Sequence, residues 1–270
     1  MRYVTNQHHE LPVPNGWFAV AWSSDLARGD VKPVRYFGED LVVFRTRSGE
    51  VRVLNALCAH LGAHLAHGGR VMGETIRCPF HGWRYDGEGR CAQIPYCDRI
   101  PPKARVRSWP VTEANGMIFA WHHAQDKPPH WEVPEIPELR DANWTEPRRF
   151  ELEVGVHVQE LAENNCDPVH FFYVHGDLEI PETTARVAED GRFMSVVGTN
   201  AVETPLGRFN VTVAREAWSL GGVVAVRLEG MGDAGLVMFN SASPIDPRRT
   251  RMRWLLTTTE GFADTVGEEF

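Results

Sequence analysis

The chain has 270 residues, 43% of them hydrophobic and 24% charged, and its formal net charge is −8. These values fit a globular protein of one large or two ordinary domains, and the acidic balance without a long Lys/Arg run argues against a nucleic-acid partner. No apolar run reaches the roughly 18–20 residues of a membrane helix, so no membrane span is expected. The first ten residues lack the apolar core of a signal peptide. We therefore expect a cytoplasmic protein, whose five cysteines are thiols or metal ligands and not disulfides.

Residues 16–123 consist of brief apolar or alternating runs, such as WFAVAW, LVVFRT and MIFAWHH, separated by turn signals. This pattern predicts an all-β domain. The proline-rich stretch that follows, residues 124–147, is typical of a linker or wrapping segment.

A second unit begins with a predicted strand over 148–154 and a predicted helix from 156 to about 166. A strand-rich region covers roughly 184–259, with clear alternation in RFNVTVA and RMRWLLTTT. We therefore predict an α+β chain with an all-β domain over 16–123 and a second domain over 124–270.

Four potential metal ligands lie in two short segments of the all-β domain. Each segment pairs one cysteine with one histidine, as Cys58-Ala-His60 and as Cys78-Pro-Phe-His81. Thiolates and imidazoles suit zinc, copper or iron–sulfur clusters, but a zinc finger usually takes both ligands of one type from one loop. Here each loop supplies one cysteine and one histidine. This arrangement suits a two-iron cluster, with two cysteines on one iron and two histidines on the other. A zinc site, or unrelated core histidines and thiols, is the competing interpretation.

The remaining cysteines, Cys91, Cys97 and Cys166, fall outside this pairing. Free cysteines are among the most buried residue types. We therefore expect these three to be plain buried thiols.

The segments CAHLGAHLAHGG and CPFHGWRYDGEGRCAQIPY closely resemble the Rieske [2Fe–2S] motif of Rieske non-heme iron oxygenases. Rieske proteins of the respiratory chain usually carry one further cysteine in each loop. The matching positions here are Ala63 and Phe80, so the resemblance is to the oxygenase type. It implies a [2Fe–2S] cluster held by two cysteines and two histidines: Cys58, His60, Cys78 and His81.

A second metal site is implied by the segment ENNCDPVHFFYVH. It resembles the family's Asp-x-x-His-x-x-x-x-His signature, with Asp167, His170 and His175 in the three positions. Two histidines and one carboxylate form the facial triad of non-heme iron(II) enzymes, which leaves positions open for O₂ and substrate. The two histidines are five residues apart, about 140° around an ideal helix. The segment must therefore distort between them, and Pro168 is consistent with such a break.

In the resembling family this aspartate is usually not an iron ligand. It bridges a histidine of the iron site to a Rieske histidine of the neighbouring subunit, so Asp167 would link His170 to the partner subunit's His81. This role implies a ring-like homotrimer. The alternative is that Asp167 only caps a helix, because Asp followed by Pro fits an N-cap with Pro at the first helical position.

The resemblance covers nearly the whole chain and implies a Rieske domain followed by a helix-grip (START-like) catalytic domain. It implies a terminal oxygenase that receives electrons from an NAD(P)H-dependent ferredoxin or flavin reductase, through the cluster, at a mononuclear iron(II) that activates O₂. Several segments, including HFFYVHG, are most similar to 3-ketosteroid 9-alpha-hydroxylase oxygenases and cholesterol 7-desaturases. The implied reaction is therefore hydroxylation or desaturation of a steroid or another bulky apolar molecule.

Three alternatives remain open. A ring-hydroxylating dioxygenase or demethylase would act on an aromatic compound, and an aromatic acid would need a positioned cation that the sequence does not identify. A Rieske ferredoxin-type electron carrier leaves the second metal pattern unexplained. A START-like lipid-binding protein explains neither metal pattern.

The third iron ligand is expected to be missing from this chain. The family draws that carboxylate from a long helix, typically well over a hundred positions after the histidine pair, whereas 95 residues follow His175 here. The final segment EGFADTVGEEF has the apolar spacing of the opening of such a helix, so we expect a C-terminally truncated chain. The alternative is that one of the late acids is the ligand: Asp264, Glu268 or Glu269.

Overall fold

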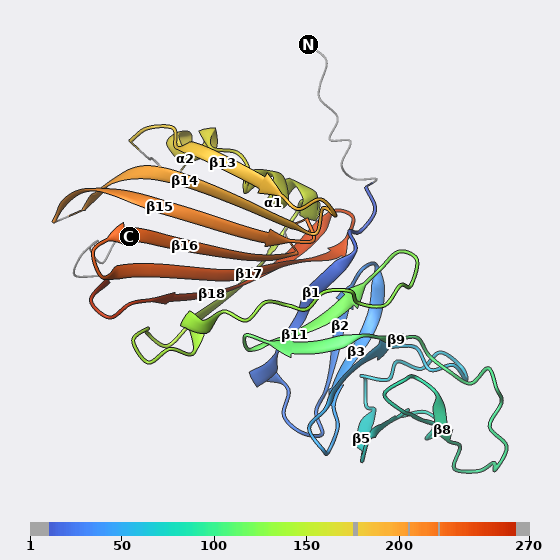
Figure 1. Cartoon of the computed structure of the whole chain (residues 1–270). Helices are drawn as coiled ribbons and strands as arrows, with labels where there is room; N and C mark the ends of the chain where they lie inside the picture. The colour runs from blue at the N-terminus through green and yellow to red at the C-terminus, as the bar shows by residue number, and fades with distance from the viewer. Residues whose placement is uncertain (1–10, 175–177, 205, 221, 263–270) are drawn as a thin grey trace. The chain divides into compact units, whose positions relative to one another are not determined.

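The computed structural model describes residues 11–174, 178–204, 206–220 and 222–262. The chain divides into two compact units: Trp17–Val133, and Met1–Gly16 together with Pro134–Phe270. Figure 1 traces the chain through both units, which are described here one at a time.

The division between the units lies at Val133, whereas the sequence placed it at 123/124. The reason is the packing of the proline-rich segment. Trp17 Nε1 donates to the backbone oxygen of Trp131 at 2.8 Å, and Trp121 Nε1 donates to that of Lys127 at 2.8 Å. Residues 124–133 therefore wrap the first unit.

The first unit is built from small antiparallel sheets. Among the described residues there are three, with strand orders β1-β11-β10, β2-β3-β4-β9 and β5-β6-β7-β8. The strands of the first are Gly16–Trp22, Met117–His122 and Val111–Ala114. Those of the second are Val31–Tyr36, Glu39–Arg45, Val51–Asn55 and Ser108–Trp109. Those of the third are Arg70–Met72, Thr75–Arg77, Arg84–Tyr85 and Cys91–Gln93, and a 3₁₀ turn spans Ser23–Asp25.

Local turn chemistry explains two of the hairpins. Asn115 and Gly116, between β10 and β11, both have positive φ (51° and 74°), as a two-residue type I′ turn requires. The turn between β2 and β3 repeats this geometry with Phe37 and Gly38. Such turns match the twist of the strands they join and fix the register of each pair.

The second unit is one seven-stranded antiparallel sheet with a helical segment. The strand order is β12-β18-β17-β16-β15-β14-β13. The strands span Arg148–Val154 (β12), Glu182–Val187 (β13), Phe193–Thr204 (β14), Gly207–Trp218 (β15), Val223–Met231 (β16), Ala234–Asp246 (β17) and Arg249–Thr258 (β18). Two helices, α1 (Val158–Asn164) and α2 (Val169–Tyr173), lie in the connection from β12 to β13, and a 3₁₀ turn spans Pro137–Leu139.

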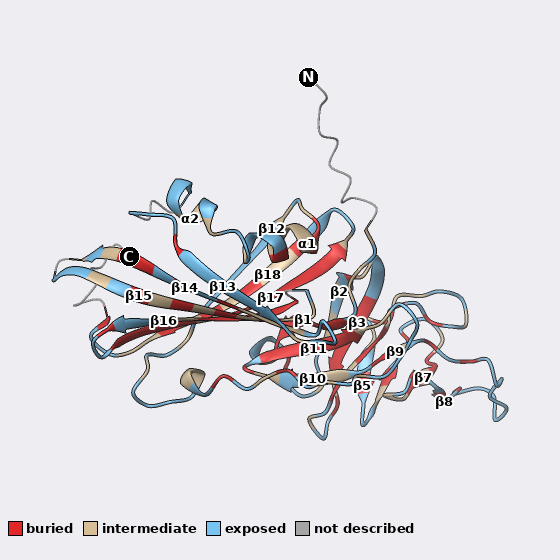
Figure 2. Ribbon diagram, turned by 45° about the horizontal axis from the view of Figure 1, so that its top comes forward, coloured by how far each residue is buried: buried red, intermediate tan, exposed pale blue. Residues whose placement is uncertain are grey.

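The edges and the centre of this sheet differ in burial. Figure 2 shows long buried stretches on the central strands, whereas β13 is exposed along its length. Helix α1 packs against β17, so the helical segment and the central strands share a core. The predicted α+β class, an all-β domain followed by a sheet-and-helix domain, is confirmed.

The predicted strand 148–154 coincides with β12, whereas the helix is shorter than the predicted 156–166. His157 ends the extended segment, and its Nδ1 accepts a hydrogen bond from Gln159 N at 3.1 Å as the N-cap. Among the described residues, no helix is long and apolar enough to span a bilayer.

Candidate functional site

The two cysteine–histidine segments fold into loops with the same backbone hydrogen bonds. Cys58 N donates to the oxygen five residues on, at 2.9 Å, and Gly62 N donates back to Cys58 O at 2.9 Å. In the second loop Cys78 N and Gly82 N repeat these bonds at 2.8 and 3.2 Å. Gly62 and Gly82 have φ of 72° and 74°, a conformation that favours glycine. The chain thus presents two equivalent loops, each after a short strand (β4 and β6).

The two loops bring their four side chains together as two pairs. Cys58 and Cys78 are buried, at 4% and 1% exposure, and the rings of His60 and His81 lie 4.6 Å apart. Burial raises the pKa of the Cys78 thiol, and the neighbouring Cys58 thiol raises that pKa further. Binding of a metal would therefore have to displace a proton from a buried thiol, which a cation in direct contact does readily.

His60 carries a polar atom that the protein leaves unsatisfied. Its ring stacks on Trp83 at 4.6 Å with an interplanar angle of 6°, and its Nδ1 is buried without a hydrogen-bond partner among the described residues. A buried unsatisfied nitrogen is costly unless something outside the chain binds it. Metal coordination through Nδ1 would supply that partner, so the donor set fits a cluster with two cysteine and two histidine ligands.

Tyr85 supports one of the sulfurs. It is fully buried, and its hydroxyl oxygen accepts a hydrogen bond from Ala59 N at 3.1 Å. The hydroxyl proton is then available to Cys58 Sγ, which lies 3.1 Å from the same oxygen. Burial, and then the hydrogen bond with Cys58, raises the pKa of Tyr85 far above its usual value. Tyr85 therefore stays protonated and acts as a donor to the sulfur.

The second candidate site lies in the sheet-and-helix unit, around α2. His170 Nδ1 lies 2.6 Å from the backbone oxygen of Asp167. Because a carbonyl only accepts, Nδ1 carries the proton, and Nε2 is the nitrogen with a lone pair for a metal. The Asp167 carboxylate accepts from Val169 N at 2.8 Å, and its other oxygen lies 3.9 Å from His170 Nδ1. Asp167 thus binds the first N–H of α2, one residue before the N-cap Pro168, and faces His170 at the same time.

A cavity of about 700 Å³ opens beside His170, within the second unit. Its walls are mostly apolar and come from the helical segment and from one face of β14 to β18. The alternation along β17 is clear, with Leu236, Met238, Asn240 and Ala242 on the cavity side. A cavity of this size suits a bulky, mainly apolar ligand held by a few polar groups.

Two protein families match the chain in succession. Residues 16–110 match the Rieske [2Fe–2S] domain, and residues 120–269 match the 3-ketosteroid 9alpha-hydroxylase C-terminal domain. The chain belongs to the 3-ketosteroid 9alpha-hydroxylase C-terminal domain family. The predicted resemblance to Rieske oxygenases of this branch is therefore confirmed, and the loops described above lie in a Rieske [2Fe–2S] domain.

Among curated relatives of this hydroxylase-family chain, cholesterol 7-desaturase nvd 1 of Ciona intestinalis is 44% identical over 162 residues, 60% of this chain and 34% of that protein. A 3-ketosteroid-9-alpha-monooxygenase oxygenase component of Rhodococcus rhodochrous is 38% identical over 195 residues, 70% of this chain and 51% of that protein. The chain thus spans about a third to a half of the length of these relatives.

Solved structures agree on the fold. Dicamba monooxygenase bound to dicamba matches with a TM-score of 0.73 at 17% identity, covering 93% of this chain and 79% of that chain. The NdmA QL mutant of Pseudomonas putida CBB5 with caffeine also matches with a TM-score of 0.73, at 22% identity, covering 91% and 74%. The fold of these structures is therefore shared along nearly the whole chain.

Only some of the predicted metal ligands lie among the residues that the structure describes. His175 and the late acids Asp264, Glu268 and Glu269 lie outside the described residues. In the described part of the chain, no three His, Cys, Asp or Glu side chains surround a single point where a metal ion would sit. Four ligands divided two and two between a pair of irons fit this finding, since neither iron then has three protein ligands.

The prediction that the other cysteines are buried holds for Cys91 and is wrong for Cys97 and Cys166. Cys97 lies in the loop after β8, where its Sγ contacts the backbone oxygen of Arg99 at 3.4 Å. Cys166 follows α1, and its Sγ lies 3.4 Å from Met194 Sδ. Both stand in connections between elements, where no second layer covers them.

Sequence reasoning missed two residues of this hydroxylase-family chain. Tyr85 gave no signal, because its contact with Cys58 joins residues 27 positions apart. Arg215 lines the cavity at 7% exposure, and its guanidinium lies 4.2 Å over the ring of Phe171, next to His170. The sequence did indicate an inward-facing Arg215, because this residue lies at a buried position of the alternating β15, between the buried Val213 and Ala217.

Proposed function

We propose that this chain carries the metal-site and pocket parts of a terminal oxygenase that hydroxylates or desaturates a steroid-like substrate. The observation that carries the proposal is the combination of two equivalent cysteine–histidine loops with a mostly apolar cavity of about 700 Å³ beside His170. The names of the relatives, which act on 3-ketosteroids or cholesterol, support the same substrate class.

In this proposal Cys58, Cys78, His60 and His81 hold a [2Fe–2S] cluster, and His170 and His175 hold a mononuclear iron(II). Bound there, the metals would supply one-electron transfer and activation of O₂. The chain's own contribution is placement. Tyr85 donates a hydrogen bond to Cys58 Sγ, and Trp83 fixes the plane of the His60 ring.

Asp167 orients His170 through its backbone oxygen and binds the first N–H of α2 with its carboxylate. We propose that the same carboxylate, which is half exposed, also contacts the partner subunit's His81 in a ring-like homotrimer. A carboxylate bonded to a metal-bound imidazole fixes the orientation of the ring and raises its basicity. Electrons would then pass between chains at this contact.

The cavity has the composition expected for a steroid-like ligand. Aliphatic side chains from five strands cover most of its wall, and a few polar groups, including Asn200 and Asn240, are placed among them. Such a wall excludes water from the bound ligand and leaves polar atoms for its oxygen substituents. The proposed partners are O₂ and an NAD(P)H-dependent ferredoxin or flavin reductase, and the proposed location is the cytoplasm.

The direct test incubates the chain with a surrogate reductase, NAD(P)H and a panel of steroids, and identifies products by mass spectrometry. If one of the late acids Asp264, Glu268 or Glu269 completes the iron site, hydroxylated or dehydrogenated products of a ketosteroid or sterol are expected; if the third ligand is missing from the chain, the steroid is bound but not converted. A preparation with full iron and sulfide content that converts no steroid, but does convert an aromatic acid, would make aromatic acids the proposed substrate class in place of steroids.

Arg215 is the observation that favours this second candidate. An aromatic acid needs a positioned cation in the pocket, and Arg215 lines the cavity beside Phe171. In this alternative the chain is a ring-hydroxylating dioxygenase or demethylase, and the Arg215 guanidinium pairs with the substrate carboxylate. Arg215→Met should abolish conversion of an aromatic acid and largely spare conversion of a neutral steroid.

A further inference from the structure

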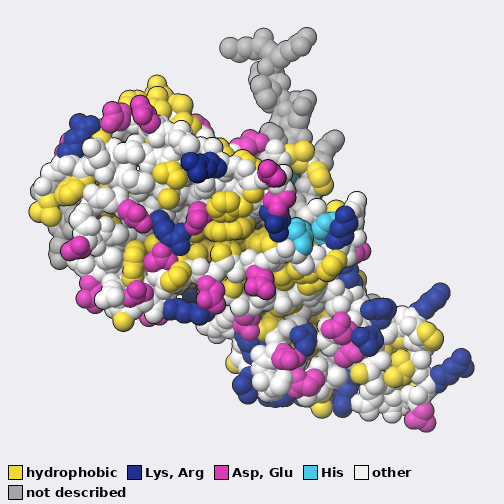
Figure 3. All heavy atoms as spheres, viewed as in Figure 1, with side chains coloured by type: hydrophobic (Ala, Val, Ile, Leu, Met, Phe, Trp, Pro, Cys, Tyr) yellow, Lys and Arg dark blue, Asp and Glu magenta, His cyan; other side chains and the backbone are white. Residues whose placement is uncertain are grey.

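Basic side chains gather in the part of the first unit that carries the second cysteine–histidine loop. Residues 70–107, here called the basic lobe, contain eight Lys or Arg and four Asp or Glu, a net charge of +4 in a chain whose net charge is −8. Figure 3 shows Lys and Arg side chains projecting from the region of β5 and β8. The basic lobe therefore has the opposite charge to the rest of the chain.

Most arginines outside the basic lobe have acidic partners. Arg45 pairs with Glu113, Arg227 with Glu138 and Glu216, and Arg251 with Glu151 and Glu153. Within the basic lobe, among the described residues, only Arg107 has an ion-pair partner, Asp126. The other seven cations have none: Arg70, Arg77, Arg84, Arg90, Arg99, Lys103 and Arg105.

Two of the four acids of the basic lobe accept hydrogen bonds from neutral groups. Glu74 accepts from the Ser48 hydroxyl at 2.6 Å, and Asp86 accepts from the backbone N–H groups of Glu88 and Arg90. Glu74 is thus bonded to a segment 26 positions away and Asp86 to its own turn, and neither carboxylate forms an ion pair within the described residues. The positive charge of the basic lobe is therefore available to a partner.

Arg90 and Arg105 are cross-strand partners in an isolated antiparallel bridge, and both are exposed. Like charges directly opposite each other destabilise a sheet. The chain nevertheless places two arginines there without an acid to separate them. Such an arrangement costs stability in the isolated protein and is favourable once an acidic surface covers it.

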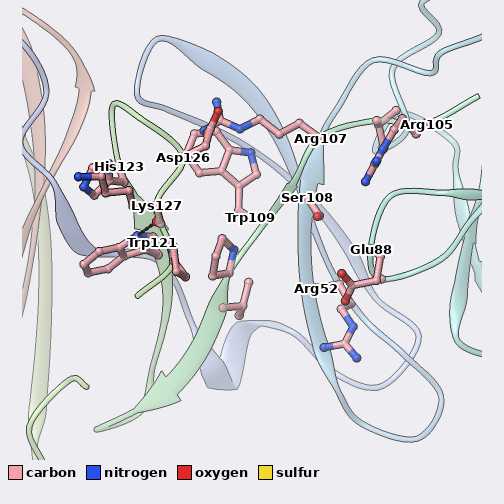
Figure 4. Close-up of a pocket in the computed structure, with 15 residues that line it drawn as sticks. Arg52, Glu88, Arg105, Arg107, Ser108, Trp109, Trp121, His123, Asp126 and Lys127 are labelled. Carbon is pink, nitrogen blue, oxygen red and sulfur yellow. Dashed lines mark hydrogen bonds and ion pairs between the residues drawn. The ribbon is translucent and has the colours of Figure 1, made fainter. Parts of the chain in front are cut away.

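Arg105 of this pair lines a cavity of about 770 Å³, whose charged lining also includes three further cations and two acids: Arg52, Arg107, Lys127, Glu88 and Asp126. Figure 4 shows these side chains around the opening, with Arg107 extended past Trp109 towards Asp126. The Arg107 guanidinium lies 4.0 Å over the Trp109 ring, which holds it in place. The edge of the cavity is thus positive and partly preorganised.

Part of the wall of this cavity comes from the turn that follows β7. The wall includes Gly87 and Glu88, two and three residues after the end of β7 at Tyr85. Tyr85, at the end of β7, lies 3.1 Å from Cys58 Sγ. The cavity wall and the Tyr85–Cys58 contact thus share one short segment of the chain, residues 85–88.

We propose that the basic lobe around the Arg90–Arg105 pair, with Lys103, Arg107 and Lys127, is the docking surface for an acidic, ferredoxin-type electron-donor protein. The inference rests on the proposed function and adds to it the place and the chemistry of the donor contact. Complementary charge speeds the encounter and orients the two surfaces. DNA or an anionic membrane would meet the same charge, but the basic lobe contains the loop of Cys78 and His81, which favours a redox protein.

The test compares Arg90→Glu/Arg105→Glu with Arg28→Glu/Lys32→Glu, a double variant of the same unit with the same change in net charge. The probe is an acidic plant-type [2Fe–2S] ferredoxin in its oxidised form, titrated at low and at high salt. We expect wild-type binding to weaken as salt rises, and the Arg90/Arg105 variant to bind at least about ten-fold more weakly at low salt. The Arg28/Lys32 control should stay within about two-fold of wild type.

The visible absorption spectrum of each variant reports whether it retains the cluster and its fold. Equal binding by both double variants would overturn the docking surface and leave the proposed function standing. Tighter binding of duplex DNA or of phosphatidylserine vesicles than of ferredoxin would also overturn it. A wild-type chain that forms no Rieske cluster would overturn the proposed function and this inference together.

Discussion

Tyr85 shows how one side chain sets the environment of a proposed cluster ligand. Its hydroxyl connects Ala59 N to Cys58 Sγ, with 3.1 Å on each side. Hydrogen bonds to the sulfurs are one of the factors that set the reduction potential of an iron–sulfur cluster. A donor to Cys58 withdraws electron density from the sulfur and favours the reduced state.

Tyr85→Phe should therefore lower the reduction potential of the cluster, measured by an EPR-monitored redox titration. The variant also leaves Ala59 N without its acceptor, which should cost about 1–3 kcal/mol of stability. The matched control is Tyr96→Phe, because the Tyr96 hydroxyl bonds Trp83 Nε1 and no sulfur. An unchanged potential in Tyr85→Phe, or an equal shift in Tyr96→Phe, would contradict this role.

Asp167→Asn separates the two roles of this residue. Asparagine keeps the size of the side chain and most of its capping ability, but removes the negative charge. We expect both metal centres to be retained, and cluster reoxidation in single turnover with O₂ and substrate to slow by about ten- to a hundred-fold. Cys166→Ser, at the neighbouring position, is the control. A normal single-turnover rate in Asp167→Asn would reduce its role to that of a cap.

The paired cysteines and histidines could be proposed as ligands from the sequence because their spacing along the chain is visible without the fold. Cys58 with His60, and Cys78 with His81, stand close together in the chain, so their chemistry is visible without the fold. Tyr85 and Arg215 depend on contacts between distant segments, which spacing does not report. For Arg215 the alternation of β15 gave its inward direction but not the cavity it faces.

At the scale of elements, the two loops form a matched pair that differs in one respect. A Cβ at Gly82 would lie 3.0 Å from Pro95 Cγ, whereas a Cβ at Gly62 would meet nothing within 4 Å. The φ angles are nearly the same, so the conformational strain of a side chain is equal in both loops. A side chain at Gly82 would add a close contact with Pro95 to this strain, whereas a side chain at Gly62 would not.

Gly62→Ala should therefore destabilise the chain by about 1–2 kcal/mol, and Gly82→Ala by more. The measurement is the unfolding midpoint of the cluster-loaded protein, followed by loss of visible absorption. Equal midpoints for the two variants would contradict the contact with Pro95.

A second prediction at this scale concerns the ion pair that joins two sheets of the first unit. Arg45 of β3 holds Glu113 of β10 through two hydrogen bonds, 2.7 and 2.8 Å long. The Arg45 guanidinium keeps the pKa of Glu113 below its usual value. A carboxyl group whose pKa is lower in the folded state stabilises the fold above its unfolded pKa and loses that effect as the pH falls.

Glu113→Gln should lower the free energy of unfolding by about 1 kcal/mol at pH 7. The difference from wild type should shrink as the pH falls below about 4.3, the usual pKa of an unfolded glutamate. Denaturant unfolding at several pH values measures this difference. Glu132→Gln, at an exposed position, is the control for removal of one carboxylate. A difference for Glu113→Gln that stays constant with pH would contradict the assignment.

Elements with strong local signals were predictable, and those set by packing were less so. The strand at 148–154 was predicted at its observed bounds, and the Asn115-Gly116 turn is a strong hairpin signal. The helix predicted over 156–166 is shorter, because the cap of His157 delays its start. The wrap of residues 124–133 depends on tryptophan contacts across the first unit, which a proline-rich composition does not specify.

At the scale of the whole molecule, the two units carry different parts of the proposed function. The first holds the paired loops and the basic lobe, and the second holds His170 and the apolar cavity. Net charge also differs along the chain, because the basic lobe of the first unit is positive whereas the chain as a whole is negative. Neither unit alone accounts for both metal patterns, which is why a ferredoxin or a lipid-binding protein explains only part of the chain.

The measurement that tests the central claim most directly is iron and sulfide content, with visible absorption and EPR, for the purified chain. We predict a Rieske spectrum with two sulfides per chain in the wild type and in the control Cys97→Ser, and its complete loss in Cys58→Ser. Zinc without sulfide in the wild type, or a Rieske spectrum that survives in Cys58→Ser, would contradict the account.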